Sequence, residues 1–168
     1  SFFVKAVVEA LKRFPDVNAS IDGNDMIYHG YFDISIAVSS PRGLVVPVIR
    51  NADKLSIKEL ATETSRLAKA AREGKLGLDD YAGGTFTVSA LGMYGVDSFT
   101  PIINHPQSGI MGVNRLYDGM DWEEERIVKS KKMNLSLTWD HRALDGAPAA
   151  EFLVEVKSLL EAPYRLLV

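Results

Sequence analysis

The fold is decided by residues 133–146, which read MNLSLTWDHRALDG. Apolar and polar side chains alternate over residues 133–139, which is the pattern of a strand with one buried face. The alternation ends before His141, and beyond Gly146 the apolar residues recur at helical spacing until Pro163. The sequence therefore predicts a strand that leads through a short polar turn into a helix, and functional residues often gather in such turns.

The rest of the chain divides into two further helices and several short strands. An amphipathic N-terminal helix of about three turns should stop before Pro15. A second helix has the capping-box residues Ser56 and Glu59 at its start and Gly74 at its end. Turns are predicted at residues 15–25, strands at 33–39, 44–49, 85–89 and 108–113, and an exposed charged hairpin at 121–132.

These elements predict the fold class. Pro47 cannot donate to a strand ladder, so residues 44–49 should lie at an edge or a bulge. Helices and strands mix without a regular βαβ rhythm. We therefore predict a single α/β domain, a two-layer sandwich with a mixed β-sheet and flanking helices.

The composition is that of an ordinary globular domain. Hydrophobic residues make up 46% of the chain and charged residues 24%, which excludes disordered and collagen-like classes. The net charge is −3, so no basic field favours nucleic acid or an anionic membrane. Cysteine is absent, which excludes disulfides, thiolate metal sites and a cysteine nucleophile. No apolar run is long enough to cross a bilayer.

His141 is the strongest candidate for chemistry among the three histidines. It follows the most clearly patterned strand, and an imidazole is the natural general base near neutral pH. His29 and His105 lie in turn and loop sequence, and we interpret both as surface residues without a catalytic role.

The other polar candidates have simple structural interpretations. Asp140 and Arg142 are expected to form an ion pair across the turn, and Asp145 stands where a helix cap is expected. Ser89 is either an oxyanion donor or an ordinary strand residue. No residues have metal-ligand spacing, and the glycines form no phosphate-binding loop, so neither a metal site nor such a loop is predicted.

The turn resembles a known signature. HRALDG at residues 141–146 is similar to the His-x-x-x-Asp-Gly motif of the chloramphenicol acetyltransferase-like superfamily. Asp140 before it narrows the resemblance to the catalytic core domain of dihydrolipoamide acyltransferases, the E2 components of 2-oxo acid dehydrogenase complexes. Nearly the whole chain resembles that domain, in the same order, through SFFVKAVVEALKRFPDVNASID, YFDISIAVSSPRGLVVPVIRNAD, REGKL, GGTFTVSALGMYG, PIINHPQSGIMGV and FLVEVKSLLEAPYRLL.

The resemblance implies roles for three residues. His141 would be the general base that takes the proton from the thiol of coenzyme A or dihydrolipoamide. Ser89 would donate to the oxyanion of the tetrahedral intermediate, and Asp145 would shape the site by pairing with an arginine. Thiol-to-thioester exchange of this kind needs a base and an oxyanion donor, and neither a metal nor an enzymic cysteine.

The resemblance also implies partners. Homotrimers would assemble into a large hollow core, and different chains would supply the histidine and the serine of each site. Residues 1–168 would be the acyltransferase catalytic domain without its N-terminal portion. The lipoyl domain, which carries the lipoyl group, and the peripheral-subunit-binding domain would lie outside this chain, and the E1 and E3 components would bind through such domains. No nucleic acid or membrane partner is expected, and the bacterial cytoplasm or the mitochondrial matrix would suit the protein.

Several alternatives stay open. The chain is an acyltransferase, an inactive structural core protein, or a coenzyme A-dependent transferase that acts on a free small molecule. A serine hydrolase built from Ser89, His141 and Asp145 is least favoured, because that chain order is unfamiliar among triads. Residues 31–51 and the PIIN-x-PQS segment resemble succinyltransferases, whereas SALGMYG and DHRALDGAPAAEFL resemble acetyltransferases of the pyruvate or acetoin type. The longer match favours succinyl.

Overall fold

The computed structural model describes residues 1–167. They contain three α-helices and nine strands. The helices are α1 (Phe2–Leu11), α2 (Ile57–Glu73) and α3 (Gly146–Glu161). The strands are β1 (Ala19–Asp22), β2 (Asp25–Tyr28), β3 (Ile34–Ile36), β4 (Val38–Ser40), β5 (Gly43–Val45), β6 (Val48–Ile49), β7 (Phe86–Ala90), β8 (Gly109–Glu123) and β9 (Arg126–Trp139).

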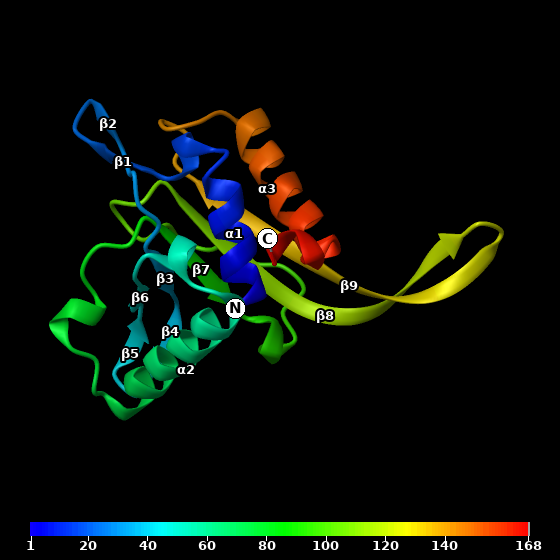
Figure 1. The fold of residues 1–168 in the computed structure, drawn as a ribbon, viewed down its shortest axis with the longest axis horizontal. Coiled ribbons are helices and arrows are strands. Elements are labelled where there is room, and N and C mark those ends of the chain that lie inside the picture. The colour runs from blue at the N-terminus through cyan, green and yellow to red at the C-terminus, as the bar shows by residue number, and fades with distance from the viewer. Residues whose placement is uncertain (168) are drawn as a thin grey trace.

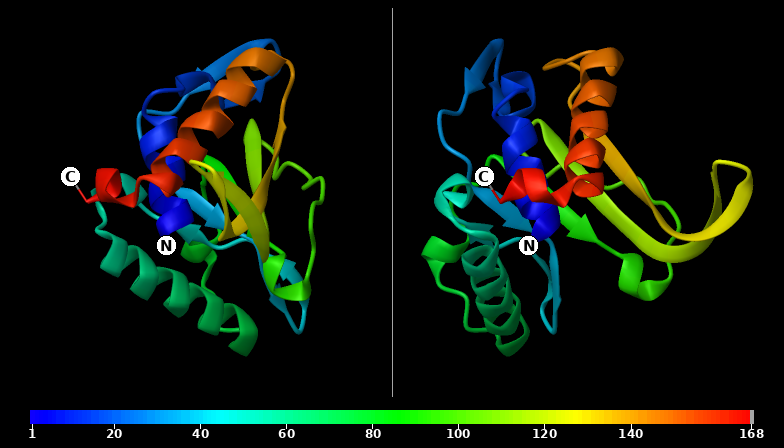
Figure 2. Two further views of the ribbon diagram at one scale, coloured as in Figure 1. Left: turned by 90° about the vertical axis from the view of Figure 1, so that its right-hand side faces the viewer. Right: turned by 45° about the vertical axis from the view of Figure 1, so that its right-hand side comes forward.

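A five-stranded mixed sheet forms the centre of the molecule, in the order β6-β3-β7-β8-β9 (Figure 1). The pairs β3–β7 and β7–β8 are parallel, whereas the two outer pairs are antiparallel. The helices form a second layer on one side of this sheet, with α1 between α2 and α3 (Figures 1 and 2). The predicted mixed-sheet α/β fold is therefore confirmed.

The core lies between the sheet and the helices, and β7, the middle strand of the sheet, lies against its centre. Phe86 of β7 is completely buried, and its ring centroid lies 5.6 Å from that of Phe152 on α3. Phe152 in turn makes an edge contact with Phe14, at 5.9 Å between ring centroids. Close packing of large rings fixes β7 against the helical layer, so its outward-facing residues are held by a rigid strand.

The second helix has the predicted ends. Ser56 accepts a hydrogen bond from the backbone N–H of Glu59 (3.2 Å), and the Glu59 carboxylate accepts one from the backbone N–H of Ser56 (2.8 Å). Gly74 ends the helix at φ 67°, a left-handed conformation that glycine adopts without strain.

Four segments differ from the sequence prediction. Residues 15–25 contain most of a β1–β2 hairpin in addition to turns, with Gly23 at φ 59° between the strands. The predicted strand 33–39 divides near Ala37, because β3 stays in the main sheet while β4 leaves it to pair with β5. The strand predicted at 108–113 continues to Glu123. The strand predicted at 44–49 is divided as well, into β5 and β6, with Val46 and Pro47 outside both. Pro47 directly precedes β6, which is the edge strand expected near it.

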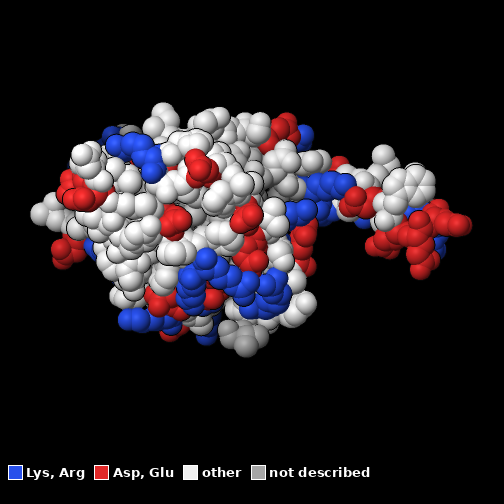
Figure 3. Space-filling view, turned by 90° about the horizontal axis from the view of Figure 1, so that it is seen from above, with Lys and Arg blue, Asp and Glu red and all other residues white. Residues whose placement is uncertain are grey.

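The hairpin of β8 and β9 continues beyond the body of the molecule as a two-stranded ribbon, here called the arm (residues 116–133; Figure 1). A register shift between Val113 and Leu116 marks its start. Acidic side chains gather at its tip, at the right of Figure 3, and come from Asp121, Glu123, Glu124 and Glu125. The predicted exposed charged hairpin is confirmed, and large apolar side chains also stand exposed along it, at Leu116, Met120, Trp122 and Ile127.

Candidate active site

The turn that follows β9 is held by hydrogen bonds among its own residues. The Asp140 carboxylate accepts bonds from Arg142 Nε (3.0 Å), Arg142 Nη2 (2.6 Å) and the Arg142 backbone N–H (2.9 Å). The backbone carbonyl of Asp140 accepts from the N–H of Ala143 (2.9 Å). The expected Asp140–Arg142 ion pair is thus confirmed, and hydrogen bonds from the Arg142 guanidinium lower the pKa of the Asp140 carboxyl.

His141 projects from this turn toward solvent, with 68% of its side chain exposed. Its Nδ1 lies 3.6 Å from Oδ1 of Asp145, which forms an ion pair when the imidazole is protonated. Nε2 of His141 has no hydrogen-bond partner among residues 1–167, so it remains available to a reacting group. The arrangement leaves a solvent-facing imidazole with a carboxylate on its other nitrogen, which suits a general base.

Asp145 occupies the position before α3, but its side chain makes no capping hydrogen bond. Its side chain is 87% exposed, and its ion-pair partner among residues 1–167 is His141. The predicted position at the helix start is confirmed, the expected cap is not formed, and the proximity of the side chain to the imidazole was not predicted.

Ser89 lies on β7, on the face of the sheet that points away from the helices. Phe86 and Val88 of the same strand belong to the core, so the alternation of the strand directs Ser89 to the opposite face, where it is half-buried. Its neighbour across the pair with β8 is Gly112, where an added Cβ would lie 2.8 Å from the Phe99 ring. The absence of a side chain at Gly112 lets Phe99 pack directly on the sheet.

Within one chain, Ser89 and His141 do not lie close together. Ser136 of β9 is level with Ser89 and two strands away from it, and Trp139 at the end of β9 lies three positions further along the strand. With about 4.8 Å between strands and about 3.3 Å per residue along a strand, Ser89 lies about 14 Å from the start of the His141 turn. A single chain therefore holds the two groups as separate halves.

The other two histidines lie elsewhere. His29 follows β2 and is half-buried, with Nε2 3.0 Å from Oγ of Ser20, and burial lowers the pKa of His29. His29 is therefore partly buried rather than fully exposed, because the β1–β2 hairpin brings Ser20 to it. His105 is exposed, as expected.

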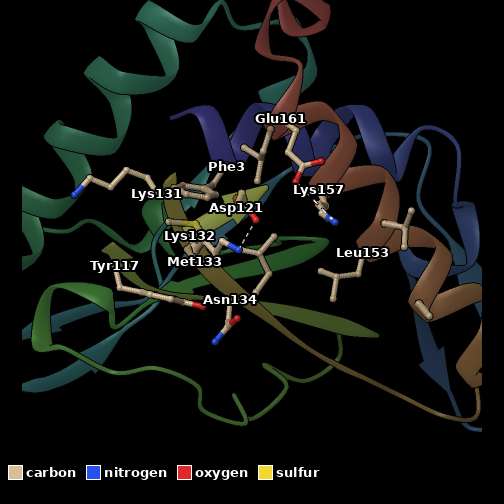
Figure 4. Close-up of a pocket in the computed structure, with 14 residues that line it drawn as sticks. Phe3, Tyr117, Asp121, Lys131, Lys132, Met133, Asn134, Leu153, Lys157 and Glu161 are labelled. Carbon is tan, nitrogen blue, oxygen red and sulfur yellow. Dashed lines mark hydrogen bonds and ion pairs between the residues drawn. The ribbon is translucent and has the colours of Figure 1, made fainter. Parts of the chain in front are cut away.

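A groove of about 1030 Å³ lies between α3 and the base of the arm (Figure 4). Its floor is apolar, with Phe3, Met133 and Leu153, and lysines at 131, 132 and 157 stand along it. None of Ser89, His141 and Asp145 lines this groove, so it is separate from the candidate catalytic groups.

Within residues 1–167, no three side chains of His, Asp or Glu gather closely enough to hold a metal ion. No helix in the same range has the length and apolar character needed to cross a membrane.

Comparisons with known proteins agree on one family. The model of the 2-oxoacid dehydrogenases acyltransferase (catalytic domain) matches residues 1–168. The chain is 52% identical over its full length to a dihydrolipoyllysine-residue succinyltransferase component of the 2-oxoglutarate dehydrogenase complex from Haemophilus influenzae, and 49% identical to that from Escherichia coli. It spans 41% and 42% of the length of these two relatives.

Solved structures agree with this match. Dihydrolipoamide acetyltransferase of Azotobacter vinelandii superimposes with a TM-score of 0.94 at 39% identity, over 99% of this chain and 69% of that one. The cubic core of a pyruvate dehydrogenase multienzyme complex gives a TM-score of 0.94 at 40% identity, with the same coverage. The Azotobacter structure concerns the catalytic role of a serine, a histidine and an asparagine that are spaced by 52 and four residues.

The mixed sheet with its single helical layer defines the class as chloramphenicol acetyltransferase-like, since a chloramphenicol acetyltransferase shares this fold at a TM-score of 0.56 and 16% identity, over 95% of this chain. That likeness concerns the fold alone. Within the class, the chain belongs to the family of 2-oxoacid dehydrogenase acyltransferase catalytic domains.

Proposed function

We propose that this chain is the catalytic domain of an acyltransferase that moves a succinyl group between dihydrolipoamide and coenzyme A in a 2-oxo acid dehydrogenase complex. The observation that carries the proposal is the placement of Ser89, His141 and Asp145. These residues are spaced by 52 and four positions, as are the serine, histidine and asparagine of the Azotobacter vinelandii acetyltransferase. The third residue differs, since Asp145 stands where that enzyme has an asparagine.

His141 acts as the general base in the proposed mechanism. Its free Nε2 accepts the proton of the attacking thiol, while Asp145 near Nδ1 stabilises the imidazolium that forms. The thiolate attacks the thioester carbonyl and forms a tetrahedral intermediate. The hydroxyl of Ser89 donates to the oxyanion of that intermediate. Collapse of the intermediate expels the second thiolate, which takes the proton back from His141.

Two copies of the chain supply each site in this proposal. The separation of Ser89 from His141 within one chain supports this arrangement, because the base and the oxyanion donor must reach the same carbonyl. A homotrimer with heterologous contacts gives three equivalent sites and a closed ring. The likeness to the cubic core of a multienzyme complex supports assembly of such trimers into a hollow core.

The remaining partners follow from the relatives. Coenzyme A and the lipoyl group are substrates, and the lipoyl group is carried on a domain outside this chain. We propose that E1 and E3 bind to domains that the longer relatives carry. We also propose that the activity takes place in a bacterial cytoplasm, in keeping with the bacterial sources of the relatives.

The test is acyl transfer to dihydrolipoamide by the full-length protein, with succinyl-coenzyme A and acetyl-coenzyme A compared as donors. We expect a preference for the succinyl donor and a loss of at least about a hundredfold in kcat for His141→Ala. Wild-type rates in His141→Ala would reject the assigned base. Intact particles without turnover of either donor would favour an inactive structural core, and a preference for a free acceptor would favour a small-molecule transferase.

Mixed assemblies test the sharing of a site between copies. Co-assembly of equal amounts of His141→Ala and Ser89→Ala chains should restore activity to about a quarter of the wild-type level, since that fraction of heterologous contacts joins an intact serine to an intact histidine. Activity no higher than the sum of the two variants would contradict a shared site.

A further inference from the structure

Trp139 connects the core of the molecule to the turn that carries His141. It is the last residue of β9, and its side chain packs against the buried cluster below the sheet. Its indole Nε1–H donates a hydrogen bond of 3.1 Å to the backbone carbonyl of Leu144, at the far end of the turn. The indole therefore links the end of β9 to Leu144 at the far end of the turn.

The same indole contacts the candidate base. The ring centroids of Trp139 and His141 lie 5.9 Å apart, with 37° between the ring planes. The side chain of His141 is 68% exposed, and a side chain this free visits several rotamers unless its neighbours favour one. Asp145 lies near one nitrogen of the imidazole, and Trp139 lies against the ring itself.

We infer that Trp139 is a positioning residue that holds the His141 imidazole in its reactive orientation, through its ring contact and its hydrogen bond to Leu144. The inference rests on the proposed function, in which His141 is the base. Small displacements of a base from its substrate cost much rate, so a contact that narrows the range of imidazole orientations increases kcat. A residue that acts through the imidazole in this way changes kcat and leaves the KM for the acyl donor nearly unchanged.

The chain has two tryptophans, so substitutions at Trp139 can be compared with a control substitution at Trp122. Trp139→Phe keeps an aromatic face near His141 and removes the N–H donor, whereas Trp139→Leu removes both. Trp122→Phe is the control, since Trp122 is 72% exposed near the tip of the arm. Steady-state transfer by the full-length protein then separates kcat from the KM for the acyl donor.

We expect kcat to fall by about three- to tenfold in Trp139→Phe, as for loss of one hydrogen bond, and by about ten- to a hundredfold in Trp139→Leu. The KM should stay within about twofold, and Trp122→Phe should match the wild type. A kcat within twofold of the wild type in both Trp139 variants would overturn the inference, as would a loss confined to KM. Trp139→Phe keeps the test decisive if Trp139→Leu does not fold.

Fluorescence provides a readout that does not depend on turnover. In the Trp122→Phe background, Trp139 is the sole indole, and a protonated imidazole quenches an adjacent indole. Emission should fall as the pH is lowered and the imidazole becomes protonated, and His141→Ala should remove most of that change. An unchanged titration in His141→Ala would reject the ring contact.

The two proposals fail in different ways. If His141→Ala transfers acyl groups at the wild-type rate, the proposed function is wrong, whatever the emission shows. If His141→Ala is inactive while both Trp139 variants keep full kcat, the proposed function stands and only the role of Trp139 is rejected.

Discussion

The two halves of the candidate site are held in opposite ways. Ser89 lies on β7, a central strand with a neighbour on each side and Phe86 buried beneath it. His141 is exposed, and the side-chain hydrogen bonds and the ion pairs of residues 140–142 are with one another and with Asp145. The oxyanion donor is therefore positioned by the fold as a whole, whereas the base is positioned by its own short segment.

This difference predicts how each half responds to substitution. Changes at the core-facing residues of β7, such as Phe86, should affect stability and activity together, because they disturb the strand that positions Ser89. Changes at the exposed residues of the turn, His141 and Asp145, should alter activity or local structure with little effect on the melting of the domain, because few buried contacts are lost there.

The largest effect is expected where β7 meets the helices. Phe86→Ala removes a fully buried ring that packs against Phe152, and it should lower the free energy of unfolding by about 3–5 kcal/mol. Chemical denaturation measures this loss. Phe2→Ala is the matched control, since Phe2 is 47% exposed, and it should cost far less. Similar losses in both variants would contradict the central role of β7.

The next effect separates the chemistry of β7 from its packing. Ser89→Ala should reduce kcat by about 10²–10³-fold, the usual cost of one oxyanion donor, with an unchanged melting temperature. Ser89→Thr keeps the hydroxyl and should recover most of the activity. Ser65→Ala on the exposed side of α2 is the control. Equal activity of Ser89→Ala and Ser65→Ala would remove Ser89 from the mechanism.

A smaller effect is expected at the third residue of the site. Asp145→Asn introduces the residue type that the Azotobacter vinelandii enzyme has at the same spacing, so kcat should change by less than about tenfold. Asp145→Ala should be the more harmful of the two, because it removes the polar side chain near Nδ1 of His141 without replacing it. Large and similar losses in both variants, measured in the same transfer assay, would show that the negative charge of Asp145 matters more than its shape, because both substitutions remove the charge.

The smallest effect concerns the pH dependence of stability in the turn. Hydrogen bonds from Arg142 lower the pKa of Asp140 in the folded chain. The pair therefore stabilises the fold at pH values above 3.8, the ordinary pKa of this carboxyl. That contribution disappears as the pH falls through the lowered value. Asp140→Asn should therefore melt slightly below the wild type at neutral pH and level with it in strong acid. Asp25→Asn, at an exposed position of β2, should show no such trend.

Sequence periodicity predicted the parts of the fold in which one local pattern decides the structure. Residues 133–139 alternate strictly, and the capping box at Ser56 marks the start of α2, so both were located correctly. The β1–β2 hairpin was missed because its turn residues, Asp22 to Asp25, dominate a short segment. The length of β8 was missed because beyond Val113 its stability comes from pairing with β9, which a local pattern does not report.

The candidate site was predictable to a similar degree. The position of His141 after a strong strand indicated a functional residue, and the family resemblance implied the roles of Ser89 and Asp145. The proximity of Asp145 to the imidazole depends on how the turn folds, and the indole contact of Trp139 depends on a side-chain rotamer. Neither contact can be predicted from the spacing of residues along the sequence.

The arm also determines where a protease should cut this protein. Its tip, at Glu124 and Glu125, is exposed and outside both strands, whereas pairs between β8 and β9 continue from Glu123–Arg126 back to Gly109–Trp139. Loop tips of this kind are preferred sites of nicking. A single cut there leaves two fragments that share one sheet and one core. The nicked protein should therefore migrate as two bands under denaturing conditions and remain one folded particle under native ones.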